Sequence, residues 1–146
     1  MAHPIPATPT GPTPHRADVK RVLVRTSAAV IGSVLLSGGV EALFLLLLHK
    51  PAWWGSWLAA LVAGLAAAVV SIVPLVPGFL GGAQAAVYAY LAAGVLRMLV
   101  TLGICMAAVF VAPVAPVPTL LLAVPIYFVQ VAAEALVLSR AFWPGK

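Results

Sequence analysis

Four long apolar stretches dominate the pattern of hydrophobic and polar positions along the chain. Each stretch runs continuously for about 20 residues, which matches the thickness of a bilayer core. None shows the alternation of apolar and polar residues that a membrane β-barrel requires. The expected spans cover residues 26–48, 57–76, 86–111 and 119–139. The pattern therefore predicts an all-α integral membrane protein with four transmembrane helices.

The segments outside these spans divide the chain into two parts. Residues 1–15 contain five prolines, which remove helix donors, and they predict a disordered tail. Residues 16–25 hold four basic residues and one acid, and they predict a short interfacial helix that leads into the membrane. The later connections are short and rich in Pro, Gly and Trp. We therefore expect residues 16–146 to form one four-helix transmembrane domain.

The composition supports a membrane location and argues against nucleic acid as a partner. Hydrophobic residues make up 64% of the chain and charged residues only 8%, whereas a soluble domain carries about 25% charged residues. The net charge of +5 would suit nucleic acid, but the basic residues lie mainly at the edges of apolar stretches. They form no basic face interleaved with aromatic residues. The lipid bilayer is therefore the expected surrounding of the chain, with no nucleic acid bound.

The positions of the basic residues also predict the orientation in the membrane. Basic residues are enriched in cytoplasmic flanks. An inside N-terminus would place six of them on the cytoplasmic side: Arg16, Lys20, Arg21, Arg25, Arg140 and Lys146. Only Lys50 would then lie in an outer loop. Both termini are therefore expected to be cytoplasmic.

Three charged residues interrupt the apolar spans: Glu41, Arg97 and Glu134. A charge at the centre of a bilayer costs about 2.5–3.5 kcal/mol, so such residues pair with one another or face a cavity. A rise of 1.5 Å per residue places Glu134, Arg97 and Glu41 at about 7, 16 and 22 Å from the inner edge. Either glutamate can therefore be the partner of Arg97, and one glutamate is left over.

Polar residues at helical spacing accompany each of these charges on one stripe of its helix. The stripes are Ser33, Ser37 and Glu41 in the first span, Tyr90, Gly94, Arg97 and Thr101 in the third, and Tyr127, Gln130 and Glu134 in the fourth. Three interpretations remain open. The charges can form a buried pair that fixes the helix register, a site completed by a partner protein, or an ion or proton path.

The second span carries a different feature, a repeat of small residues. Ala60, Gly64 and Ala68 recur at four-residue spacing, and this spacing is typical of helix faces that approach a neighbouring helix closely. We therefore expect these three residues to lie in a helix-packing interface.

Nothing in the chain indicates catalysis, a metal site or a cofactor. The single cysteine, Cys105, has no histidine at helical spacing, and His49 neighbours Lys50 near the end of a span. None of the common hydrolase, metalloprotease or phosphate-binding motifs occurs. We therefore expect no catalytic residues, and a protein that is not an enzyme.

The spans together resemble the ATP synthase protein I family, small four-helix membrane proteins that accompany bacterial rotary ATP synthases. The likeness begins with the basic segment VKRVLVRTSAAVIGSVLL and continues in the first hairpin, HKPAWWGSWLAALVAGLAAAVVSIVP. It is clearest in YLAAGVLRMLVTLGICMAAVFV, and the last span shares the Val-Gln step of the family at Val129–Gln130. Arg97 stands where the family has a membrane lysine. The glutamate of the family would fall on Gly94 and is absent, whereas Glu41 and Glu134 are not part of the family pattern.

The resemblance implies an assembly factor in the bacterial plasma (inner) membrane. Family members are thought to help the c-subunits of the rotor form their ring, and a c-subunit hairpin carries a membrane carboxylate that Arg97 would hold. The alternative is a small ion or solute transporter, which would have to self-associate because four helices alone make no pore. Arg97 argues against a cation path unless a glutamate neutralises it. A homo-oligomer is compatible with either function.

Overall fold

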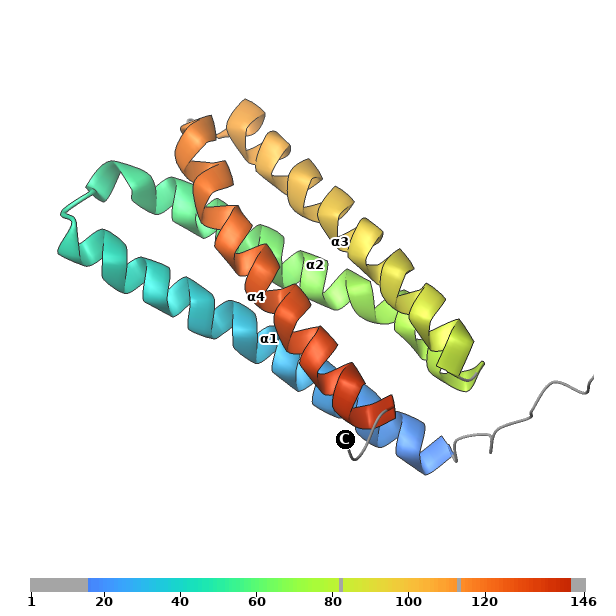
Figure 1. Ribbon diagram of the computed structural model, residues 1–146. Helices are drawn as coiled ribbons and strands as arrows, with labels where there is room; N and C mark the ends of the chain where they lie inside the picture. The colour runs from blue at the N-terminus through green and yellow to red at the C-terminus, as the bar shows by residue number, and fades with distance from the viewer. Residues whose placement is uncertain (1–15, 82, 113, 143–146) are drawn as a thin grey trace, which may run out of the picture.

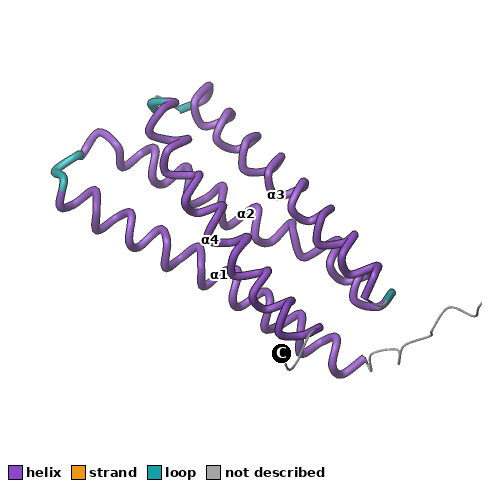
Figure 2. The backbone as a smooth tube through the Cα atoms, in the orientation of Figure 1, coloured by secondary structure: helices purple, strands orange, loops and turns teal. Residues whose placement is uncertain are grey.

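The computed structural model describes residues 16–81, 83–112 and 114–142, which form four long helices and one short turn of helix (Figure 1). The elements are α1 (Arg16–Leu47), the 3₁₀ turn η1 (Pro51–Trp53), α2 (Trp54–Leu80), α3 (Ala83–Val111) and α4 (Pro116–Phe142). Figure 2 shows that only short loops connect the helices. The tail predicted for residues 1–15 lies outside the described residues.

The four helices contain segments long and apolar enough to cross a membrane, which confirms the predicted fold class at this level. The segments are Lys20–Leu47, Pro51–Leu80, Gln84–Val111 and Pro116–Arg140.

Two helices differ from the sequence-based expectation. Helix α1 is continuous from Arg16, so the basic segment is its first turns and not a separate interfacial helix. Helix α2 continues through Pro74 and Pro77 to Leu80, beyond the expected end of the span at residue 76. Backbone polar groups in lipid need internal partners, and this favours continuing the helix across its prolines.

The helices are not packed equally against one another. Helices α2 and α3 form the closest pair, and α4 packs on α1 and α2 more extensively than on α3. Helix α1 and helix α3 make no substantial contact within the described residues. The start of α1 and the end of α4 lie at the same end of the bundle (Figure 1). Whether this end faces the cytoplasm stays a prediction.

Small residues allow α2 to lie in the centre of the bundle. Ala60, Gly64 and Ala68 are all buried. A Cβ atom added at Gly64 would lie 2.7 Å from Cγ2 of Ile126 on α4 and 3.4 Å from Cγ1 of Val34 on α1. Contacts below 3.0 Å are essentially never made by real Cβ atoms. The absence of a side chain at Gly64 therefore brings three helices together at one level.

Candidate functional site

The most unusual feature of the bundle is an ion pair inside its apolar region. The Nη2 atom of Arg97 on α3 donates to the Oε2 atom of Glu134 on α4, at a distance of 2.5 Å. Both side chains are completely buried. Of the two glutamates that the sequence left open as partners for Arg97, the structure pairs Glu134.

Helix direction allows these two side chains to meet although the sequence-based estimate places the two residues at different depths. Side chains on a helix tilt toward its N-terminus. Helix α3 begins at the end of the bundle where the termini lie, whereas α4 ends there. Arg97 therefore leans toward that end and Glu134 leans away from it, so that their charged groups approach the same level.

Glu41 is on α1, which makes no substantial contact with the helix of Arg97, α3, within the described residues. It follows Gly38 by one turn of α1, and the carbonyl of Gly38 accepts a hydrogen bond of 2.9 Å from Nε1 of Trp57. Glu41 is half-buried, and neither of its carboxyl oxygens has a hydrogen-bond partner among the described residues. The polar stripe of α1 therefore does not complete the charge network of α3 and α4.

Several polar atoms around the ion pair remain without partners in the described part of the chain. These atoms are Nε and Nη1 of Arg97, Oε1 of Glu134, Oε1 of Gln130 and Oγ1 of Thr101. The amide nitrogen of Gln130 donates to the carbonyl of Gly64 at 2.7 Å and thereby connects α4 to α2. Buried polar groups are normally hydrogen-bonded. Arg97 and Glu134 therefore retain unused capacity for a polar ligand.

Two adjacent cavities follow the seam between α3 and α4, and we call them together the α3–α4 groove. The first, about 290 Å³, is lined by Tyr90, Leu91, Gly94, Val95, Arg97, Met98, Tyr127, Val131 and Glu134. The second, about 210 Å³, is lined by Met98, Thr101, Leu102, Cys105, Leu120, Ala123, Val124, Tyr127 and Phe128. Met98 and Tyr127 belong to both cavities. The groove therefore joins an apolar half to a half that borders the ion pair.

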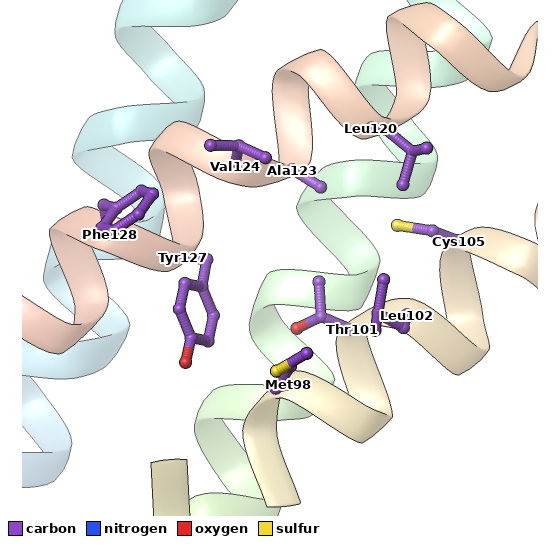
Figure 3. Close-up of a pocket in the computed structure, with 9 residues that line it drawn as sticks. All are labelled: Met98, Thr101, Leu102, Cys105, Leu120, Ala123, Val124, Tyr127 and Phe128. Carbon is purple, nitrogen blue, oxygen red and sulfur yellow. The ribbon is translucent and has the colours of Figure 1, made fainter. Parts of the chain in front are cut away.

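The apolar half of the groove is shown in Figure 3. Met98, Thr101 and Cys105 extend from α3, and the ring of Tyr127 extends from α4 on the side of Met98 and Thr101. Cys105 has no disulfide partner and is buried. The polar stripes of the sequence predicted the participation of Thr101 and Tyr127 but not that of the apolar lining, for which the sequence gives no signal. The same apolar residue types occur on helix surfaces that face a groove and on those that face lipid.

Gly94 gives the groove its space beside the ion pair. A Cβ atom added at this position would meet no atom within 4 Å. The neighbouring turn contains Arg97, so the missing side chain leaves room next to the guanidinium.

The described residues contain no group of three or more His, Cys, Asp or Glu placed to hold a metal ion. The sequence matches no protein-family model, no curated protein and no solved structure. The resemblance to the ATP synthase protein I family therefore stays a prediction.

Proposed function

We propose that this protein is a membrane accessory factor that binds a transmembrane segment of a partner protein in the α3–α4 groove. The observation that carries the proposal is an open groove beside a buried ion pair with unpartnered polar atoms. Helix α3 supports it, because only 11% of its most apolar segment is buried within the bundle, against 28–39% for the corresponding segments of the other three helices. Much of the surface of α3 therefore remains accessible to a second protein within the bilayer.

The chemistry of the groove indicates the kind of segment that it would accept. The apolar half suits a hydrophobic helix, and the donors Nε and Nη1 of Arg97 suit a carboxyl group. A c-subunit hairpin combines these properties, and it is the partner that the family resemblance implies. On this proposal the protein assists the formation of the c-ring in the bacterial inner membrane, with both of its own termini in the cytoplasm.

The sharpest test fills the groove without disturbing the packing of the bundle. Leucine at position 94 would extend into the cavity beside Arg97, because its Cβ atom meets nothing within 4 Å. Gly103 on the same helix is the matched control, since its Cβ position is equally open and it does not line the groove. We expect purified Gly94→Leu to lose co-purification of c-subunits and Gly103→Leu to retain it. Recovery of c-subunits with Gly94→Leu at the level of the unmodified protein would contradict the proposal.

A second variant tests the role of the charges. Arg97→Ala alone would leave Glu134 buried without its partner, so a loss of binding could reflect damage to the fold. Replacing both charges, Arg97→Met with Glu134→Met, removes the ion pair and leaves no charge unpaired. This double variant is expected to insert and fold but to bind the c-subunit weakly. Binding at full strength would show that the charges do not contact the partner.

A small oligomeric ion or solute transporter is the second candidate, and one observation favours it. Glu134 neutralises Arg97, which removes the main objection to a cation path. The purified protein can be reconstituted in proteoliposomes and tested for ion uptake. Accessory binding predicts no uptake above that of empty vesicles. Uptake that disappears in Glu134→Gln would instead support transport.

A further inference from the structure

A separate cavity of about 240 Å³ lies between α1 and α4, at the end of the bundle where the termini lie. The described residues that line it are Val22 and Arg25 from α1 and Val137 and Arg140 from α4. None of these described residues also lines the α3–α4 groove.

The described residues that line this cavity carry positive charge. Arg25 and Arg140 bring two guanidinium groups to it, and none of the four lining residues is acidic. Both arginines are exposed, whereas Arg97 is completely buried and paired with Glu134. The two arginines of the cavity are therefore available to an anion from outside the bundle.

The walls of the cavity are apolar and held in place by the core. Val22 and Val137 are half-buried. Val22, and Leu138 next to Val137, pack against a buried cluster on α2 and α3 that includes Leu75 and Phe79. An occupant would therefore meet a firm apolar surface between two positive groups.

The position of the cavity matches the boundary of the membrane. Arg140 is the last residue of one membrane-spanning segment, and Arg25 lies near the beginning of another. Arginine at this level can reach the headgroup region, where lipid phosphates lie. Guanidinium groups bind phosphate oxygens through paired hydrogen bonds, which a single ammonium group does not reproduce.

We infer that this cavity binds the phosphate headgroup of an anionic phospholipid. Arg25 and Arg140 hold the phosphate from two helices, and Val22 and Val137 contact the apolar part of the lipid just below it. A phosphate ion free in solution would be held by the same arginines but would make no use of the apolar walls. The bound lipid would connect α1 to α4 at the membrane surface.

The inference can be tested by native mass spectrometry of the protein released from nanodiscs. One set of nanodiscs contains phosphatidylcholine alone and the other adds phosphatidylglycerol. We expect the unmodified protein to retain one phosphatidylglycerol. The double variant Arg25→Gln with Arg140→Gln is expected to retain it at least about fivefold less often, as the loss of charge-assisted hydrogen bonds implies.

Lys20→Gln is the matched control, because it removes one exposed positive charge from the same end without lining the cavity. It should change lipid retention less than about twofold, since a charge outside the site acts only through the screened surface field. An equal loss in Lys20→Gln and in the double variant would overturn the inference in favour of diffuse attraction. Unchanged retention in the double variant would also overturn it.

A third arm distinguishes the source of the phosphate. The protein in phosphatidylcholine nanodiscs is incubated with inorganic phosphate, and the bound mass is measured again. Phosphate binding that depends on Arg25 and Arg140 and displaces phosphatidylglycerol would overturn the assignment to a lipid. The absence of a phosphate adduct, together with a retained phosphatidylglycerol, is the expected result.

Discussion

The side of α3 that packs on α2 and the side that faces α4 are built in opposite ways. On the α2 side, a Cβ atom added at Gly78 would overlap the Cβ atom of Ala89 and would lie 3.2 Å from the carbonyl oxygen of Ala85. On the α4 side, a Cβ atom added at Gly94 would meet nothing within 4 Å. Glycine thus permits close contact in one seam and leaves space in the other.

The difference shows how the bundle combines stability with an open site. Small residues let the backbones of α2 and α3 approach, and dispersion contacts then hold the two helices together. Helix α4 packs instead on α1 and α2, and its described polar contact with α3 is the ion pair of Arg97 and Glu134. The α3–α4 seam therefore has one described polar contact, in addition to the apolar packing around Cys105, and a cavity lies beside that contact.

The largest effect is expected from removing one charge of this single polar contact. Glu134→Ala leaves the guanidinium of Arg97 buried without its partner, and breaking a buried pair in this way costs about 3–5 kcal/mol. The free energy of unfolding can be measured in bicelles by steric trapping. The double variant Arg97→Met with Glu134→Met should lose much less free energy of unfolding than Glu134→Ala, because it leaves no buried charge unpaired. A loss below about 1 kcal/mol in Glu134→Ala would mean that the pair is hydrated, as exposed pairs are.

The fold followed from the sequence more completely than the site did. Long apolar runs have few alternatives to helices in lipid, so the four spans could be predicted from hydropathy. The boundaries were less certain, because Pro74 and Pro77 are tolerated inside α2. The polar stripes that the sequence predicted on α3 and α4 include Arg97 and Glu134, which the structure pairs. Depth alone could not choose between Glu134 and Glu41, since that choice depends on which helices are neighbours.

The next largest effect is expected where α2 and α3 are in closest contact. Gly78→Leu forces a side chain into the closest contact between α2 and α3, and overpacking of this kind costs about 1–3 kcal/mol. Gly94→Leu, with open space at its Cβ atom, should change the free energy of unfolding by less than about 0.5 kcal/mol, as for substitutions without a steric conflict. Thermal unfolding in detergent measures both. Equal destabilisation by the two variants would show that the two seams do not differ.

A smaller effect is expected at the hydrogen bond that holds α4 to α2. Gln130→Leu removes the bond from Nε2 to the carbonyl of Gly64, and hydrogen bonds between membrane helices contribute about 0.6 kcal/mol on average. The same substitution also removes the unpartnered Oε1 atom of Gln130, which reduces the loss further. Steric trapping should therefore report a change of at most about 1 kcal/mol. A larger loss would indicate that Gln130 contributes more to the contact between α4 and α2 than one hydrogen bond provides.

The smallest effect is expected at Glu41, the intramembrane acid that lies away from the groove. Its carboxyl oxygens have no hydrogen-bond partner in the described residues, so Glu41→Gln breaks no bond that the structure shows. The free energy of unfolding should change by less than about 0.5 kcal/mol, as for other substitutions that remove no contact. The proposed binding of a c-subunit should also be unchanged, because Glu41 is not among the described residues that line the groove. A loss of binding with the fold intact would place the partner against α1 and would refute the assignment of the α3–α4 groove as the docking site.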